Sequence, residues 1–544
     1  MTKFIFITGG VVSSIGKGII SSSLASLLKL SKYKVRIRKL DPYLNIDPGT
    51  MNPSQHGEVF VTEDGAETDM DLGHYERFTG IKSKKSDNIT TGKVYSEVLR
   101  KERKGDYLGS TVQVIPHVTN EIKNFIKRDL NKEDFVICEI GGTVGDIESL
   151  PFLEALRQLR NELGRSKTLF IHLTLVPFIS SANEFKTKPT QHSVKELLGL
   201  GIQPDILLCR TERLFSNDSK KKIALFCNLS LGSVIMVENA KTIYEIPLKL
   251  HNEGLSSQVF KHFKMKKKSI NLNLWQNFIH KFENLENEVS VAIVGKYTNL
   301  SESYKSLNEA LFHSGIHNNT RVNISWIDSR KLLKTNIIFK TLSKYHGILV
   351  PGGFGKDGSE GKINSIKFAK EFKTPFLGIC FGMQLAVIES IRNIKGFENS
   401  SSTEFGVTRI PIISMMHEWQ NNKKIQKQDM ENLGGSMRLG SYESLLKENT
   451  LISSIYNKKR IFERHRHRYE VNYNYLKTIR KSGVILSGRS PNGKLIEVME
   501  RKDHPWFLGV QFHPELKSTP FKPHPIFNSF IAALIKFKNK NEKN

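Results

Sequence analysis

Cysteine is scarce in this chain, which has four in 544 residues. So few cysteines exclude a disulfide framework, and the absence of any C-x-x-C pair argues against a structural zinc site. Cys138, Cys209 and Cys227 lie within apolar runs, which favours buried small side chains at all three positions. The fourth, Cys380, differs because it stands in a glycine-framed turn.

Long apolar runs are also missing. No stretch reaches the roughly 20 residues that a membrane-spanning helix needs. The longest candidate, 169–180, contains His172 and Pro177 and is predicted to be a buried strand. The opening run Lys3–Thr8 meets Gly9-Gly10 at once, so it predicts a first strand rather than a signal peptide. We therefore expect a cytoplasmic protein with no membrane partner.

Acidic residues are in the minority, with 54 Asp and Glu against 81 Lys and Arg and a net charge of +27. A basic chain is one mark of a nucleic-acid-binding protein. Here the basic runs 220–222, 264–268 and 536–543 are short and scattered, and no recognised nucleic-acid module accompanies them. We favour a dispersed lysine bias and expect no nucleic-acid partner. The excess of cations would still suit polyanionic substrates such as nucleoside triphosphates.

Apolar strands alternate with helix-like runs in both halves of the chain. This predicts an α/β fold with two doubly wound domains and mainly parallel sheets. We expect a first domain at 1–265, a Lys- and Asn-rich linker at 266–288, a second domain at 289–537 and a frayed tail at 538–544. The predicted strands are Lys3–Thr8, Val35–Lys39, Phe135–Glu139, Thr168–Leu175, Ile206–Cys209, Val234–Val237, Val289–Val294, Val322–Ile327, Gly347–Val350, Phe376–Ile379, Gly483–Leu486 and Leu508–Gln511.

A strand, a glycine-rich turn, a lysine and a helix follow one another at Gly9–Gly18. This order is typical of a phosphate-binding loop, in which backbone N–H groups hold phosphate oxygens and the lysine neutralises their charge. The spacing from Gly10 to Gly16 is one residue longer than in the Walker A pattern. Gly18 also replaces the usual Ser or Thr, so Ser13 and Ser14 are the hydroxyls that remain.

Two acidic residues are candidate ligands for the Mg²⁺ that accompanies ATP. Glu139 ends an apolar strand, and ligands of α/β sheets bind at that end of the strands. For Asp71 taken alone, a solvated loop carboxylate is the simpler interpretation. The segment Lys186–Gln191 is basic and rich in hydroxyls, and two interpretations stay open for it, a phosphate-binding segment or a solvated turn around Pro189.

In the second half, an apolar strand ends in the turn Gly378-Ile-Cys-Phe-Gly382. The same form, with serine, is the nucleophile elbow of hydrolases. A thiolate needs a base, and His513-Pro-Glu515 supplies a histidine with a carboxylate to orient it. N–H groups near Gly353 are candidates for an oxyanion hole, and Arg468 is a candidate clamp for a carboxylate.

Taken together, these motifs resemble the CTP synthase family, glutamine-dependent amidoligases, over nearly all of residues 1–535. The resemblance rests on Gly9–Gly18, Lys39–Tyr43, Asp47–Thr50, Gln55–Asp69, Glu139–Ser149, Lys186–Gln191, Pro351–Gly355, the Cys380 turn, Leu433–Gly440 and His513–Glu515.

The resemblance implies binding residues for each substrate. It implies that ATP is held by Ser14, Ile15, Gly16, Lys17, Gly18, Ile19 and Asp71, with Mg²⁺ on Asp71 and Glu139. It implies that UTP and the feedback inhibitor CTP are held by Ser13, Asp146, Ile147, Glu148, Lys186, Thr187, Lys188, Pro189, Thr190, Gln191 and Lys222. L-glutamine would contact Gly353, Phe381, Gly382, Met383, Gln384, Glu404 and Arg468 beside the triad Cys380, His513 and Glu515.

The reaction implied by the resemblance has three steps. ATP phosphorylates O4 of UTP, the thiol releases ammonia from glutamine, and ammonia travels past His56 to displace the phosphate. The resemblance also implies activation by GTP and assembly of dimers into tetramers. Two departures stand out: Lys356-Asp357 lies where the family usually has an aromatic or similar residue followed by Arg, and Phe381 replaces a leucine, which is expected to narrow the glutamine pocket.

Two other interpretations stay open on the sequence alone. One is a different amidotransferase that shares only the thiol domain. The other is a nucleic-acid-binding or structural protein, such as a filament former.

Overall fold

The computed structural model describes residues 2–296, 301–415, 418–421, 424–427 and 437–542. The chain forms two compact units, the first made of Met1–Pro48 and Asp71–Ile279 and the second of Gly49–Met70 and His280–Asn544. The short segment Gly49–Met70 therefore packs with the second unit, although the chain on both sides of it belongs to the first.

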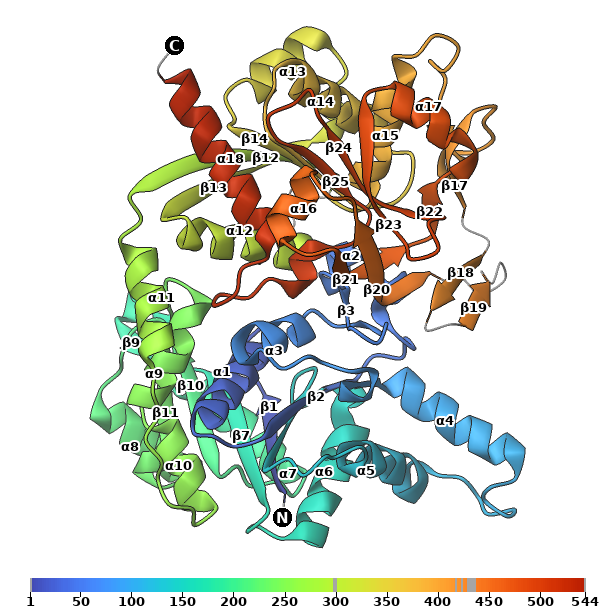
Figure 1. The fold of residues 1–544 in the computed structure, drawn as a ribbon. Helices are drawn as coiled ribbons and strands as arrows, with labels where there is room; N and C mark the ends of the chain where they lie inside the picture. The colour runs from blue at the N-terminus through green and yellow to red at the C-terminus, as the bar shows by residue number, and fades with distance from the viewer. Residues whose placement is uncertain (1, 297–300, 416–417, 422–423, 428–436, 543–544) are drawn as a thin grey trace. The chain divides into compact units, whose positions relative to one another are not determined.

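The first unit contains a seven-stranded sheet in the order β11-β10-β7-β1-β6-β2-β5 (Figure 1). All its neighbouring strands run parallel. The predicted strands of this half are confirmed, and only the three-residue edge strand β5 of this sheet was not predicted. The strands are β1 (Lys3–Gly9), β2 (Val35–Asp41), β5 (Asn88–Thr90), β6 (Phe135–Ile140), β7 (Thr168–Leu175), β10 (Ile206–Thr211) and β11 (Val234–Glu238).

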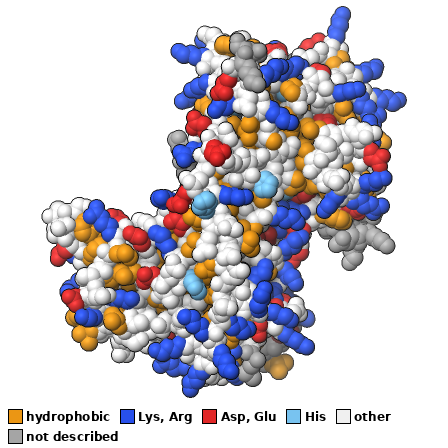
Figure 2. All heavy atoms as spheres, turned by 60° about the vertical axis from the view of Figure 1, so that its left-hand side comes forward, with side chains coloured by type: hydrophobic (Ala, Val, Ile, Leu, Met, Phe, Trp, Pro, Cys, Tyr) orange, Lys and Arg blue, Asp and Glu red, His pale blue; other side chains and the backbone are white. Residues whose placement is uncertain are grey.

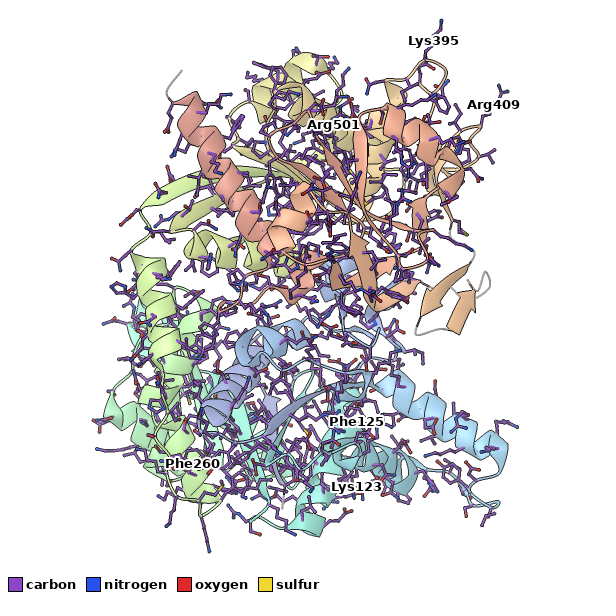
Figure 3. The ribbon with its side chains drawn as sticks, in the orientation of Figure 1. Lys123, Phe125, Phe260, Lys395, Arg409 and Arg501 are labelled. Carbon is purple, nitrogen blue, oxygen red and sulfur yellow. The ribbon has the colours of Figure 1, made fainter. Side chains whose placement is uncertain are left out.

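Helices cover both faces of this sheet. Helix α1 (Lys17–Leu30) packs with α3 (Asp71–Thr79), α9 (Ile246–Asn252) and α10 (Leu255–His262) on one face. On the other face lie α4 (Thr91–Lys104), α5 (Thr119–Lys127), α6 (Leu150–Leu163) and α7 (Lys188–Gly199), whose apolar side chains meet those of the strands in one core. Phe125 of α5 and Phe260 of α10, both labelled in Figure 3, are buried parts of these two layers.

The expected linker 266–288 contains a helix, α11 (Asn273–Glu283). Its Trp275 is 1% exposed, and the indole N–H donates to Oγ of Ser26 in α1 at 3.3 Å. The ring also stacks near Tyr244, with centroids 6.1 Å apart. Much of the linker is therefore an amphipathic helix that packs on the first unit. Its few apolar residues sit at helical spacing, which the Lys- and Asn-rich composition concealed.

The second unit contains a nine-stranded sheet in the order β13-β12-β14-β15-β25-β24-β23-β20-β21. The strands from β13 to β25 run parallel, and the rest are antiparallel. The predicted strands are confirmed, whereas β20, β21 and β24 were not predicted. The strands are β12 (Asn287–Gly295), β13 (Thr320–Asp328), β14 (Gly347–Val350), β15 (Phe376–Ile379), β20 (Arg438–Leu446), β21 (Arg460–His467), β23 (Val484–Arg489), β24 (Ile496–Arg501) and β25 (Phe507–Val510).

Two apolar cores lie on the two sides of this sheet. One holds α14 (Ser359–Glu371), α15 (Phe381–Arg392) and α17 (Leu476–Lys481), and the other holds α12 (Lys305–His317), α16 (Leu451–Tyr456) and α18 (Pro525–Asn541). Helix α18 continues to Asn541, so the tail expected to fray from 538 is helical at its start. The terminal residues stay helical because Ile531 and Leu534, one turn earlier, are fully buried and anchor the helix.

The surface is polar and basic. Figure 2 shows Lys and Arg side chains spread over the visible face and mixed with acidic and neutral ones. None of the helices in the described part of the chain combines the length and the apolarity that a bilayer span requires.

Candidate functional site

The phosphate loop joins β1 to α1 in the first unit. Val11, Ser14 and Gly16 all have positive φ, so the loop turns in the left-handed region before α1 begins at Lys17. Ser13 and Ser14 are exposed on the loop. Gly18 lies in the first turn of α1, and a Cβ there would fall 2.0 Å from Oδ1 of Asp71. Only glycine at this position lets the carboxylate approach the start of the helix so closely.

The predicted acids meet at this helix start. Nζ of Lys39 contacts a carboxylate oxygen of Asp71 and lies 2.9 Å from Oε1 of Glu139. Burial, and then the neighbouring charge of Asp71, raise the pKa of Glu139 to about 7. Burial likewise raises the pKa of the nearby Asp41 to about 6. The carboxylates of Asp41, Asp71 and Glu139 thus converge on one buried cation, the ammonium group of Lys39.

This arrangement fits a divalent cation. Mg²⁺ is usually held in proteins by one or two carboxylates together with phosphate oxygens. Asp71 and Glu139 offer two such carboxylates at the carboxyl end of β6. The ammonium group of Lys39 lies between them, which shows that the pair can hold a positive charge. No group of three or more acidic, His or Cys ligands occurs among the described residues, so the phosphates would have to complete the set.

The loops after the neighbouring strands β1 and β6 are tied to each other. Nζ of Lys17 donates to the carbonyl of Gly142 at 2.6 Å, and the N–H of Val144 donates to the carbonyl of Gly9 at 2.8 Å. Both bonds join the phosphate loop to the loop after β6. That second loop carries the exposed residues Asp146, Ile147 and Glu148. The loop is held in a turn by a hydrogen bond of 2.9 Å, which the N–H of Thr143 donates to the carboxylate of Asp146.

Of the residues expected to hold UTP, Lys186–Gln191 lie at the start of α7, which follows β7. Gly10 of the phosphate loop packs against this helix, since a Cβ at Gly10 would fall 1.6 Å from Oγ of Ser193. The hydroxyl of Thr190 donates to the carbonyl of Leu175 at 3.0 Å and anchors the first turn. Lys188 is exposed, Lys186 pairs with Glu184, and Lys222 is exposed on the adjoining α8 (Asn217–Phe226). Thr187, Pro189 and Gln191 complete the turn.

A cavity of about 320 Å³ opens beside the phosphate loop. Of the residues that line it, only Ile15, Gly16 and Ile19 were predicted from the sequence to belong to the site. The other walls come from α1, β7, the ends of β10 and β11, and the segment that leads from β11 into α9. Arg210 of β10 also donates to the carbonyl of Ile15 at 3.1 Å. The signal that would have found them is their place at the carboxyl ends of parallel strands. The lining residues are Ile15, Gly16, Ile19, Ile20, Leu173, Arg210, Val237, Glu238, Asn239, Ala240, Ile243 and Ile246.

The second unit contains the thiol turn. Cys380 follows β15 with φ 51° and ψ −102°, a conformation that strains a residue with a side chain. A Cβ at Gly382 would fall 2.0 Å from the carbonyl oxygen of Val350, so the start of α15 can pack on β14 only through glycine. The thiol is held at the turn, where its sulfur lies 3.8 Å from the carbonyl oxygen of Arg466 and 3.7 Å from Nε2 of Gln511.

His513 and Glu515 lie next to this thiol. Nδ1 of His513 is 2.7 Å from Oε1 of Glu515. Burial disfavours the imidazolium form, but the charges of Glu515 and Cys380 outweigh burial and raise the pKa of His513 to about 10. Nε2 of His513 has no hydrogen-bond partner among the described residues. The histidine is thus oriented through one nitrogen and presents the other on the side of the sulfur.

The remaining predicted residues of this site lie around the turn. The N–H of Gly355 donates to Oε1 of Glu404 at 2.6 Å, and burial raises the pKa of Glu404 although Arg468 opposes the shift. Nε2 of Gln384 donates to the carbonyl of Tyr469 at 2.8 Å. The turn also contains Phe381, Met383 follows it in α15, and Gly353 lies on the loop after β14. The ring of Phe381 is buried in the core against Phe405, with ring centroids 6.0 Å apart. Leu433–Ser436 of the resembling motifs lie outside the described residues.

Sequence reasoning missed Lys362 of α14. It is 1% exposed, and its Nζ stands 4.9 Å from the centroid of the Phe381 ring. Its Nζ would also be 3.7 Å from a Cβ at Gly353. Burial lowers the pKa of Lys362 to about 7. No local pattern marks this lysine, because it looks like any other charged residue in an amphipathic helix.

The segment Gly49–Met70 is clamped by β21. Nη1 of Arg464 donates to the carbonyl of Val61 at 3.0 Å, and Nε of Arg466 donates to Glu67 at 2.8 Å. Since the carbonyl of Arg466 also faces the thiol, this arginine joins the segment to the nucleophile. His56, which the resemblance places near the path of ammonia, lies in the same segment, 3.4 Å from Asp69.

Comparison with known proteins covers almost the whole chain. The family model described as CTP synthase N-terminus matches residues 3–265, and that of class-I glutamine amidotransferase matches residues 299–533. A CTP synthase of Paramagnetospirillum magneticum is 58% identical over 537 residues, covering 98% of this chain and 99% of the relative. One from Pelagibacter ubique is 60% identical over 535 residues, with the same coverage.

Among solved structures, the glutaminase domain of a Trypanosoma brucei CTPS with bound acivicin is 34% identical to this chain. It covers 46% of this chain and 94% of its own, with a TM-score of 0.41.

Proposed function

The chain belongs to the CTP synthase family, whose members aminate UTP to CTP with glutamine, and we propose that it does so with an ATP-dependent step in the first unit and glutamine hydrolysis in the second. The single observation that carries this proposal is that one chain contains two sites. One is a phosphate loop with converging carboxylates, and the other is a cysteine on a strained backbone turn beside a histidine that is oriented by a carboxylate.

We assign the ATP phosphates to the loop Ser14–Ile19. Backbone N–H groups at the start of α1 and the ammonium group of Lys17 hold phosphate oxygens. The cavity lined by Ile15, Arg210 and Asn239 has room for the adenine base beside them. Asp71 and Glu139 would hold Mg²⁺, which would supply positive charge against the negative charge of the phosphates. The chain itself supplies position and positive charge for transfer to O4 of UTP.

We assign UTP to the start of α7 and the neighbouring loops. Ser13, Lys186 to Gln191 and Lys222 would supply hydroxyls, amides and positive charges, which suit a triphosphate. Asp146, Ile147 and Glu148 follow β6, which is separated from β7 by β1, and the product CTP would bind there as an inhibitor. GTP activation and tetramer assembly belong to this proposal as well, through the likeness of the sequence to the family.

We assign glutamine hydrolysis to Cys380, His513 and Glu515. The thiolate attacks the amide carbon, and the imidazolium gives its proton to the amide nitrogen, which leaves as ammonia when the C–N bond breaks and the thioester forms. N–H groups near Gly353 and Phe381 stabilise the oxyanion, and the thioester is then hydrolysed by water. Arg468 and Glu404 offer opposite charges for the carboxylate and ammonium groups of the substrate, and Gln384 and Gly382 shape the turn that holds it. Ammonia must reach UTP unprotonated, which favours an enclosed route.

Lys188→Ala tests the assignment of UTP. We expect the KM for UTP to rise about 10-fold or more, because a charge-assisted contact to phosphate contributes about 1.5–3 kcal/mol. The KM for ATP should change far less. The measurement is initial velocity of CTP formation with ammonium as the nitrogen donor, which removes the glutaminase from the comparison. Lys195→Ala, which removes an exposed lysine of the same helix, is the matched control. Unchanged KM for UTP in Lys188→Ala and Lys186→Ala would overturn the assignment.

Glu515→Gln tests the role of the carboxylate beside His513. The carboxylate holds the pKa of His513 at about 10, so the imidazolium persists well above neutral pH. Without it the pKa should fall, because the remaining contribution of burial lowers it. We expect the alkaline limb of glutamine hydrolysis to move to lower pH, with kcat/KM at neutral pH reduced about 10²-fold.

The matched control is Glu448→Gln, which removes an exposed carboxylate paired with Lys459. The profile of this control should follow that of the unaltered enzyme. An unaltered alkaline limb in Glu515→Gln would show that the carboxylate does not govern the histidine.

A further inference from the structure

A buried histidine stands between the phosphate loop and the helix to which we assign UTP. His172 lies in β7, opposite Thr8 of β1, and is fully buried. Its Nδ1 is 2.8 Å from the hydroxyl of Thr8, and its Nε2 is 2.8 Å from the hydroxyl of Ser193 in α7. Thr8, His172 and Ser193 therefore form a continuous hydrogen-bonded chain from β1 to α7.

The two ends of this series of hydrogen bonds, Thr8 and Ser193, lie at the two regions to which we assign the substrates. Thr8 is followed directly by Gly9 and Gly10, where the phosphate loop begins. Ser193 lies one and a half turns after Lys188, the first residue of α7. Gly10 also packs directly on the chain, since a Cβ there would fall 1.6 Å from Oγ of Ser193 and 3.1 Å from Nε2 of His172. A displacement at either end is thus opposed by contacts at the other.

His172 is suited to hold position rather than to exchange protons. Burial, and then the charge of Lys17, lower the pKa of its imidazole to about 3, so the ring is neutral at physiological pH. A neutral imidazole has one donor and one acceptor nitrogen, and both are used here. Because both partners are buried, removing one link would leave a polar group without a partner in the core.

We propose that His172 is a positioning residue through which binding of ATP at the phosphate loop and binding of UTP at α7 favour each other. The proposal rests on the assignment of UTP to α7. Bound ATP restricts the motion of the loop that begins at Gly9. The hydrogen bonds from Thr8 through His172 to Ser193 then restrict the motion of the first turns of α7. UTP therefore binds to a helix that is already held in its bound position. By reciprocity, UTP raises the affinity for ATP by the same factor.

The test measures the dissociation constant of UTP by calorimetry on the full chain, with and without a non-hydrolysable ATP analogue and Mg²⁺. Protein concentration is chosen so that the assembly state is the same in all titrations. We expect the analogue to tighten UTP binding about 5- to 100-fold in the unaltered protein. Ser193→Ala, which cuts the link to α7 by removing one hydroxyl, should reduce this factor to about 1–2 and change the affinity for either nucleotide alone less than about 3-fold.

Ser23→Ala is the matched control, because Oγ of Ser23 is buried in α1 and has no hydrogen-bond partner among the described residues. It should keep the coupling factor of the unaltered protein. His172→Leu should lose the coupling, and His172→Gln, which retains a donor and an acceptor, should restore part of it. An unchanged factor in Ser193→Ala and His172→Leu, or no coupling in the unaltered protein, would overturn the proposal. Loss of UTP binding in Lys188→Ala with coupling unaffected by Ser193→Ala would leave the proposed function standing and remove this inference alone.

Discussion

Replacing Cys380 with alanine is expected to abolish CTP formation from glutamine and to leave CTP formation from ammonium almost unchanged. The thiol of Cys380 is the attacking group, and the other three cysteines lie in the first unit. Loss of a nucleophile removes its whole reaction path, so glutamine-dependent activity should fall at least about 10³-fold. Free ammonia bypasses that path and needs only ATP, UTP and the first unit.

The measurement is the rate of CTP formation with each nitrogen donor, followed by chromatography. Cys227→Ala is the matched control, since it removes a buried thiol of the first unit that no proposed step uses. Both activities should survive in the control. Loss of ammonium-dependent activity in Cys380→Ala would show that the two reactions cannot be separated in this chain, and glutamine-dependent activity in that variant would remove the thiol from the mechanism.

Replacing Lys17 with alanine is expected to have the complementary effect, a loss of CTP formation from both donors. Lys17 is 9% exposed and stands at the start of α1, where its ammonium group holds the loop after β6 through Gly142. Without it, the phosphates lose a buried positive charge at the point where transfer occurs. We expect kcat/KM to fall about 10²- to 10³-fold with either donor.

Glutamine hydrolysis measured without nucleotides is the second readout for this variant. It should stay at the level of the unaltered enzyme, because the triad lies entirely in the second unit. Lys34→Ala, an exposed lysine just before β2, controls for the loss of one charge. Normal rates of CTP formation in Lys17→Ala would contradict the assignment of the phosphate loop.

The parts of the sites that could be predicted from the sequence are those in which neighbouring residues suffice. The turn around Cys380 and the loop Gly9–Gly18 are short patterns whose glycines serve local geometry, such as the close approach of Gly18 to Asp71. The parallel strands could also be predicted, because strands buried on both faces are continuous apolar runs. The pairing of His513 with Glu515 could be predicted for the same reason, since a single residue lies between the two side chains that bond each other.

What could not be predicted depends on distant parts of the chain coming together. Lys39 pairs with Asp71 and Glu139, which lie far along the sequence, and Arg210 reaches the phosphate loop from another strand. The antiparallel strands β20 and β21 were missed because they carry buried charges such as Arg438, which pairs with Glu497 at 2.7 Å. A charged residue is predicted to be exposed when only the sequence is known, because its burial depends on a partner of opposite charge that lies elsewhere in the sequence.

The division of the chain is the clearest case of this limit. Gly49–Met70 lies within the sequence of the first unit but packs with the second. Its attachment depends on Arg464 and Arg466, which follow about four hundred residues later. No composition change marks either end of the segment, so a boundary drawn on the sequence passes over it.

The central claim is that one chain joins ammonia released from glutamine to UTP at the expense of ATP. It is tested most directly by incubating the purified protein with UTP, ATP and Mg²⁺, with glutamine or ammonium as the only nitrogen donor, and measuring CTP. The account predicts CTP from both donors, with ADP and glutamate formed in proportion when glutamine is used. CTP from neither donor would contradict it.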